Sequence, residues 1–180
     1  MLDCIVIGAG QAGLAVGYYL RKKGLDFVLL DAESGPGAAW RHTWPSLTLF
    51  SNSASSNLPG WPMPHHESFP PASHVIDYFA RYEQRYELPI RRPVTVDEVT
   101  HDGACFHVFA GKEQLTARTV VAATGTWSAP FIPTTPVLLA EGNGIPPSIQ
   151  APRTLPDLPW RSWARPIPVP KSRPSSYSPA

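Results

Sequence analysis

The feature that most constrains the fold is a glycine-rich turn that directly follows a buried strand. Residues 3–7 form an almost unbroken apolar run, which is typical of a parallel strand covered on both faces. Residues 8–13 then carry the GxGxxG spacing, and a helix is predicted after them. Residues 27–30 predict a second buried strand, which ends at Asp31. This order predicts a right-handed βαβ unit in an α/β, Rossmann-like fold.

The same turn predicts where a nucleotide would bind. A lone GxGxxG is a weak signal, but here an acid closes the next strand at close to the roughly 20 residues expected after the glycines. In this pattern Gly8 allows the tight turn, Gly10 lets a pyrophosphate approach the backbone, and Gly13 lets the helix pack closely. Phosphates would lie on free amides at the helix N-terminus, and Asp31 would accept from a ribose hydroxyl. The predicted contacts are Gly8, Gly10, Gln11, Ala12, Gly13, Asp31 and Ala32.

The rest of the first 136 residues is predicted to add one helix and a small antiparallel meander. Residues 34–72 indicate an irregular segment with one short helix at most, and Ser73 is the expected N-cap of a helix that ends near Glu87. The predicted strands after that helix cover residues 94–99, 105–110, 114–117 and 119–124.

Periodicity also predicts which helix faces are buried. Apolar residues recur at helical spacing in both segments, which favours one inward face on each helix. The predicted inward residues are Ala12, Val16, Tyr19 and Leu20 in the first helix and Val75, Phe79, Tyr82 and Tyr86 in the second.

Proline marks a change of character near residue 136. The chain holds 22 prolines, and ten of them fall between residues 137 and 180. Prolines at this density block both helices and strand ladders. We therefore expect a domain over residues 1–136 and a disordered proline-rich tail over residues 137–180. The abrupt change is what a truncated or frame-shifted reading frame would produce.

Composition narrows the classes of function. Charged residues make up 16% of the chain and the formal net charge is +1, which argues against a nucleic-acid-binding protein. No apolar run is long enough to predict a membrane span, and the N-terminus does not resemble a signal peptide. Cys4 and Cys105 each lie in an apolar stretch, which fits a reducing cytoplasm. The six histidines show no metal-ligand spacing, no metal site is expected, and no Ser-His-Asp or Cys-His arrangement stands out.

Together with the glycine turn, several further motifs resemble the flavin-containing monooxygenase and Baeyer–Villiger-like group of FAD-dependent oxidoreductases. The resemblance covers about residues 1–136. It implies FAD as cofactor, NADPH as reductant in the full-length family, and a small organic substrate. The motifs are Gly37–Arg41, Ser46–Phe50, Leu58–Trp61, Phe69-Pro70, Asp77-Tyr78, and Val120–Trp127 with Pro130 and Pro133.

The resemblance also implies additional cofactor contacts. The stretch that matches Gly37–Trp40 lies near the flavin in the family, and Ala38 replaces a family glycine, so a positive φ is not expected there. The backbone near Val96–Val99 would meet the adenine, and the Ala-Thr-Gly stretch would link the flavin and nicotinamide domains. Taken alone, Trp40 is better explained as a core or surface aromatic residue, and Arg41 is equally well explained as a solvated loop charge or as a phosphate partner. The added contacts are Trp40, Arg41, Val96, Val99, Ala123, Thr124 and Gly125.

Three functions remain open at this point. The first is an FAD-dependent monooxygenase-type oxidoreductase, present as an N-terminal fragment, because the second dinucleotide fingerprint of the family is not found in the 180 residues. The second is a non-catalytic remnant that holds FAD or ADP. The third is an NAD(P)-dependent Rossmann dehydrogenase, which Thr124-Gly125 disfavours. Catalytic residues, the substrate and the oligomeric state are not predicted.

Overall fold

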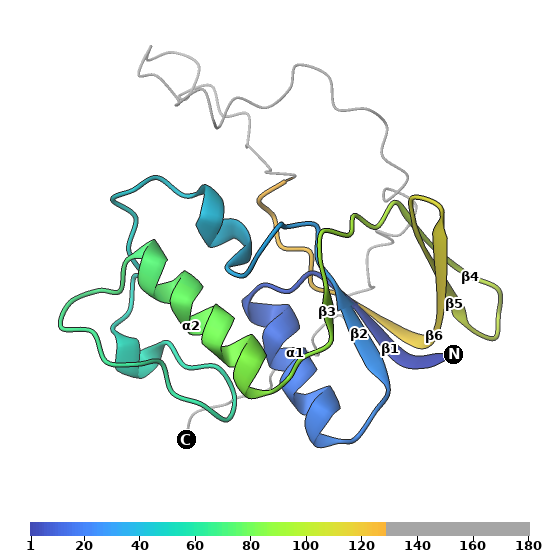
Figure 1. The fold of residues 1–180 in the computed structure, drawn as a ribbon, viewed down its shortest axis with the longest axis horizontal. Helices are drawn as coiled ribbons and strands as arrows, with labels where there is room; N and C mark the ends of the chain where they lie inside the picture. The colour runs from blue at the N-terminus through green and yellow to red at the C-terminus, as the bar shows by residue number, and fades with distance from the viewer. Residues whose placement is uncertain (129–180) are drawn as a thin grey trace, which may run out of the picture. The chain divides into compact units, whose positions relative to one another are not determined.

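A computed structural model describes residues 1–128 as an α/β fold built on one mixed sheet. The predicted βαβ unit is confirmed: β1 (Leu2–Ile7) leads into α1 (Gln11–Lys22), which leads into β2 (Phe27–Leu30). β1 pairs in parallel with β2 on one side and with β6 (Glu113–Ala122) on the other (Figure 1). The glycine turn therefore leaves the sheet from its middle.

The six strands lie in the order β3-β2-β1-β6-β5-β4. The short strand β3 (Ile90–Arg91) joins β2 in parallel, and β4 (Glu98–His101), β5 (Phe106–Ala110) and β6 form the predicted antiparallel meander. The boundaries differ most from prediction in two places. Residues 94–97 precede β4 instead of belonging to it, and the strands predicted at 114–117 and 119–124 are one strand.

The single strand β6 has a physical reason. Its first half pairs antiparallel with β5, and its second half pairs in parallel with β1. Ala117 pairs with both Phe106 and Leu2, so the partner changes at that residue while the backbone stays extended. The change of partner alters the burial pattern along the strand. In the sequence, this altered pattern of apolar and polar residues resembles the boundary between two separate strands.

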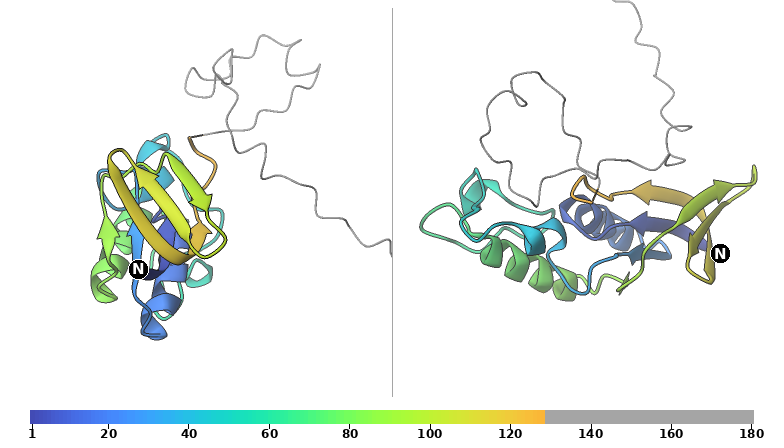
Figure 2. Two further views of the ribbon diagram at one scale, coloured as in Figure 1. Left: turned by 90° about the vertical axis from the view of Figure 1, so that its right-hand side faces the viewer. Right: turned by 90° about the horizontal axis from the view of Figure 1, so that it is seen from above.

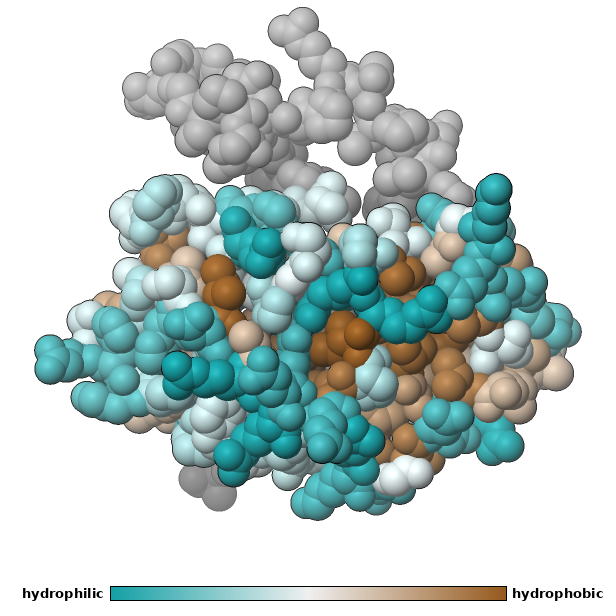
Figure 3. Space-filling view, in the orientation of Figure 1, coloured by the Kyte–Doolittle hydropathy of each residue, from teal (hydrophilic) through white to brown (hydrophobic). Residues whose placement is uncertain are grey.

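Each face of the parallel sheet carries its own hydrophobic core. The two helices cover one face, where Val6 and Leu29 meet Leu14, Tyr78 and Tyr82. The meander curls over the other face, as the two views in Figure 2 show. There the buried residues are Ile5, Val28, Leu30, Val108 and Ala117. Figure 3 shows hydrophobic side chains at the surface over this second core, which is covered less completely.

The inward face predicted for α1 is partly wrong. Ala12 and Tyr19 are exposed, whereas Gly13, Leu14 and Gly17 are buried. A Cβ on Gly13 would overlap the Gly8 carbonyl oxygen, so the helix lies against the sheet through its glycines. Glycines carry no apolar signal, and the hydrophobic pattern therefore marked neighbouring positions.

The second helix is close to its prediction. Helix α2 (Ala72–Arg85) begins at Pro71 as N-cap, not at Ser73, and no side chain caps it. The Pro71 carbonyl accepts from the Val75 amide at 3.3 Å, so the first helical hydrogen bond forms two residues earlier than predicted. Val75, Phe79 and Tyr82 are buried as predicted, and Tyr78 joins them, while Tyr86 follows the helix and is half-buried.

Two short 3-10 helices, η1 (Ala38–His42) and η2 (Ser53–Ser55), interrupt the segment predicted to be irregular. The predicted tail at residues 137–180 lies outside the described residues. Within residues 1–128, no helix is long and apolar enough to cross a membrane.

Candidate functional site

The predicted nucleotide contacts come from the carboxyl ends of three parallel strands. From β1 the chain runs to β2 and β3 on one side, and it returns as β6 on the other. Such a reversal of strand order leaves a crevice in which α/β folds bind ligands. The glycine turn follows β1, Asp31 follows β2, and residues 123–125 follow β6. The Ala123 amide donates to the Ile7 carbonyl at 2.8 Å, so the ends of β1 and β6 stay together.

The three fingerprint glycines are required for different reasons. Gly8 has a φ of +100°, and a Cβ there would overlap the Ala123 carbonyl oxygen. A Cβ on Gly13 would overlap the Gly8 carbonyl oxygen. Gly10 has an extended backbone, and among the described residues its Cβ would meet a single atom, the Ala38 Cβ at 3.3 Å. The described protein therefore needs glycine at positions 8 and 13. Beside Gly10 the described surroundings are open except for one tight contact, with the Ala38 Cβ.

The N-terminus of α1 offers unpaired amides next to that space. Gly10 is the N-cap and no side chain caps the helix, while the first helical hydrogen bond runs from the Leu14 amide to the Gly10 carbonyl. Nothing within residues 1–128 accepts from the amides of Gln11, Ala12 or Gly13. The helix dipole adds partial positive charge, so this end of α1 can hold an anion such as a phosphate.

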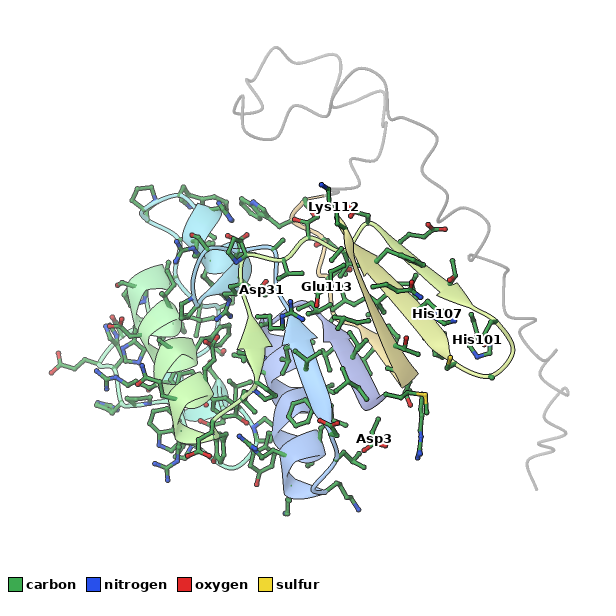
Figure 4. All side chains as sticks on the ribbon, turned by 45° about the vertical axis from the view of Figure 1, so that its right-hand side comes forward. Asp3, Asp31, His101, His107, Lys112 and Glu113 are labelled. Carbon is green, nitrogen blue, oxygen red and sulfur yellow. The ribbon has the colours of Figure 1, made fainter. Side chains whose placement is uncertain are left out.

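Asp31 lies at this edge of the sheet but already has a partner. Asp31 is 5% exposed, and its carboxylate oxygen Oδ2 accepts from Arg92 Nε at 2.6 Å. Among the described residues nothing donates to Asp31 Oδ1, which leaves that oxygen for the predicted ribose hydroxyl. Ala32 follows it in an exposed position. Figure 4 labels Asp31 at the end of its strand.

Sequence reasoning missed the ion pairs behind Asp31. Arg92 also donates to both carboxylate oxygens of Glu83 on α2, each at 2.8 Å. Burial lowers the pKa of Arg92, but the hydrogen bonds to Glu83 and Asp31 outweigh it, so the pKa is raised and the guanidinium stays charged. Nothing in the sequence indicated that Arg92 would reach Asp31, because Arg92 follows β3, a strand of two residues that is too short to show periodicity.

Trp40 and Arg41 lie on η1 and play different parts. Trp40 is half-buried against the helical core, whereas the Arg41 guanidinium contacts its own loop, at 3.1 Å from Ser34 Oγ and 3.3 Å from the Pro36 carbonyl. The expectation for Ala38 is wrong: its φ is +46°. A left-handed alanine is strained by about 1–2 kcal/mol but is not forbidden.

A cavity of about 130 Å³ opens beside the start of α1. It is smaller than the roughly 300 Å³ of a complete small-molecule pocket, so it would take only part of a ligand. Its wall combines apolar, hydroxyl and amide side chains, among them Gln11, Trp40, Ser51, Ser56, Met63 and Phe79.

The remaining predicted contacts divide into two groups. The Val94 amide donates to the Asp31 carbonyl at 2.8 Å, which holds the loop that contains Val96 near the end of β2. Val99 instead pairs with Val108 in the meander and packs in the second core. Beyond β6, Thr124 and Gly125 are exposed next to the glycine turn, and Gly125 has a φ of +65°.

Known proteins resemble this chain in sequence and in fold. Residues 5–139 match the family model described as pyridine nucleotide-disulphide oxidoreductase. The chain is 34% identical over 134 residues to the uncharacterised oxidoreductase CzcO of Bacillus subtilis, which covers 74% of this chain and 39% of CzcO. It is similar to the solved flavin-containing monooxygenase from Stenotrophomonas maltophilia, with 48% identity and a TM-score of 0.71 over 74% of this chain and 41% of that chain.

A third similarity is to an oxidized steroid monooxygenase solved with NADP bound. The identity is 25% and the TM-score 0.62, over 69% of this chain and 26% of that chain. The chain thus spans about two-fifths of the length of CzcO and of the Stenotrophomonas monooxygenase.

Proposed function

Since this chain belongs to the pyridine nucleotide-disulphide oxidoreductase family and is of its flavin monooxygenase type, we propose that it forms the FAD-binding part of an NADPH-dependent oxidoreductase. The substrate class is a small organic molecule that becomes oxygenated. The compartment is the cytoplasm, where both cysteines, Cys4 and Cys105, stay as free thiols.

The observation that carries the proposal is that a side chain at Gly10, unlike one at Gly8 or Gly13, would meet no backbone atom of the described residues. The protein needs glycine at positions 8 and 13 for its own packing, but within the described residues only Ala38 contacts a side chain placed at position 10. A pyrophosphate that approaches the backbone there supplies a stronger reason for a glycine than this one side-chain contact does.

The residues present fit the adenosine diphosphate half of FAD. The amides of Gln11, Ala12 and Gly13 would hold the pyrophosphate, and Asp31 Oδ1 would accept from the ribose hydroxyl. Arg92 fixes the Asp31 carboxylate through its other oxygen, which keeps the acceptor in one orientation.

The cavity beside Gln11 and Trp40 would take part of the flavin half. Bound FAD supplies electron transfer from NADPH and activation of oxygen. The chain's own side chains limit water there: Trp40 and Phe79 form apolar wall, and the Ser51 and Ser56 hydroxyls provide hydrogen-bonding groups.

The test is a ligand-binding series on the 180-residue protein. FAD, ADP and NAD⁺ are titrated separately, and binding is followed by flavin fluorescence or calorimetry. We expect saturable binding of FAD that is at least tenfold tighter than that of NAD⁺. Tighter binding of NAD⁺ would favour the dehydrogenase alternative, and equal affinity for FAD and ADP would favour the remnant that recognises only the adenosine diphosphate half.

A further inference from the structure

A second cluster of chemistry-bearing side chains lies on the hairpin between β4 and β5, at the far edge of the sheet from β3. It consists of Asp102, Cys105 and His107, and one donor atom from each lies within 4.8 Å of the other two. Figure 4 labels His107 on this hairpin, well separated from Asp31. The histidine spacing showed no metal-ligand pattern, because this cluster holds one histidine and takes its other donors from Asp102 and Cys105.

The arrangement is unsuited to a nucleophilic triad. In such a triad the nucleophile and the carboxylate bind opposite nitrogens of the imidazole. Here both approach the same nitrogen: His107 Nε2 lies 2.9 Å from Asp102 Oδ2 and 3.8 Å from Cys105 Sγ. Three donor atoms around one point are the arrangement expected of a metal-ligand set.

The distances agree with tetrahedral coordination. Zinc binds sulfur at about 2.3 Å and nitrogen or carboxylate oxygen at about 2.0–2.2 Å, so tetrahedral angles place sulfur about 3.5 Å from the other ligands and nitrogen about 3.3 Å from oxygen. The observed separations are 3.7 Å for Cys105 Sγ to Asp102 Oδ2, 3.8 Å for sulfur to nitrogen and 2.9 Å for nitrogen to oxygen. Shifts of about 0.2–0.4 Å would complete the set.

The ligands are also held from behind. Asp102 Oδ1 accepts from the amides of Ala104 at 2.8 Å and Cys105 at 2.9 Å, which leaves Oδ2 directed at the cluster. His107 Nδ1 lies 2.9 Å from the Gln114 side-chain amide. With the amide turned over, the Gln114 oxygen accepts from Nδ1–H and leaves Nε2 free for an ion, as outer partners of zinc-bound histidines do.

We propose that Asp102, Cys105 and His107 bind a divalent transition-metal ion of the zinc class, with water at the fourth position. A thiolate, an imidazole and a carboxylate are the donor types that zinc takes. Binding releases the thiol proton of Cys105 and moves the His107 ring proton from Nε2 to Nδ1, so one proton leaves per ion bound. The carboxylate and thiolate then balance the charge of the ion.

Cobalt(II) titration of the full chain under reducing conditions tests the site. We expect one equivalent to produce a thiolate-to-cobalt charge-transfer band, which zinc then removes by competition. Cys105→Ser should abolish the band, and Gln114→Ala should weaken cobalt binding roughly tenfold. His101→Ala, on the same hairpin, is the control and should leave the titration unchanged.

Thermal unfolding gives a second readout that does not depend on the charge-transfer band. Zinc should raise the unfolding midpoint of the wild-type chain and of His101→Ala, but not that of Cys105→Ser. The proposal is overturned if the wild type shows no charge-transfer band, or if the band persists in Cys105→Ser. Neither readout involves flavin, so failure here is distinct from failure of the proposed function.

Discussion

At the scale of single residues, the glycine turn separates protein packing from ligand contact. Gly8 and Gly13 contact each other and Ala123 so closely that no side chain fits. We predict that Gly8→Ala or Gly13→Ala lowers the free energy of unfolding by about 1–3 kcal/mol or more, the range for overpacked sites. Urea unfolding measures the loss. Gly24→Ala, where nothing surrounds the missing Cβ but φ is +68°, serves as a control for backbone strain alone.

Two adjacent arginines test how far burial decides the strength of an ion pair. The Arg92 side chain is 12% exposed between Asp31 and Glu83, whereas Arg91 and Glu113 are 43% and 44% exposed. Removal of one partner from a buried pair leaves an uncompensated charge and costs about 3–5 kcal/mol. An exposed pair contributes about 0–1 kcal/mol. We therefore predict that Arg92→Ala destabilises the chain far more than Arg91→Ala in the same denaturant experiment; equal losses would contradict this reading.

At the scale of elements, helix α2 is fixed by buried tyrosines. The Tyr78 hydroxyl donates to the Trp61 carbonyl and the Tyr82 hydroxyl to the Pro59 carbonyl, each at 2.6 Å. Burial raises the pKa of both hydroxyls above the ordinary tyrosine value. Hydrogen bonds from these two hydroxyls hold the irregular segment before the helix, and the hydroxyls can donate only while they are protonated.

This arrangement predicts a loss of stability at alkaline pH. The pKa values of Tyr78 and Tyr82 are higher in the folded chain than in the unfolded chain. Their full contribution to the free energy of unfolding is therefore present below about pH 10, and it is lost as the pH rises further. Two such groups give a slope of up to about 2.7 kcal/mol per pH unit. Tyr82→Phe should roughly halve that slope, while the exposed Tyr19→Phe should not change it. Denaturant titrations between neutral and alkaline pH measure the slope, and a slope unaffected by Tyr82→Phe would refute the assignment.

Element positions were predictable where local chemistry decides them. The GxGxxG turn, the buried strands around it and the inward face of α2 all follow from spacing and periodicity. The inward face of α1 did not, because Gly13 and Gly17 make contact by lacking side chains. The continuous β6 did not either, because its change of partner at Ala117 depends on strands distant in sequence.

The candidate site divides in the same way. Residues 8–13, Asp31 and residues 123–125 converge as strand ends must in a parallel sheet. The Arg92 ion pairs required the fold, since a tertiary contact joins Arg92 to Asp31. Cys105 and His107 are two residues apart and so share one face of an extended strand, but the cluster is complete only because the turn brings Asp102 to them.

At the scale of the whole molecule, the 180 residues contain one dinucleotide fingerprint, at residues 8–13. A hydride donor needs a dinucleotide site of its own, so we predict that these 180 residues bind FAD without steady NADPH oxidation. Consumption of NADPH at ordinary enzyme rates, about 1 s⁻¹ or faster, in protein free of contaminating reductases would contradict this.

The central claim is that the space beside Gly10 holds the pyrophosphate of FAD. The most direct measurement is the FAD affinity of Gly10→Val beside that of the wild type, with circular dichroism and urea unfolding on both proteins. We predict that the folded variant binds FAD at least 100-fold more weakly, because the valine side chain occupies the position of the phosphates. A folded Gly10→Val protein that binds FAD as tightly as the wild type would contradict the account.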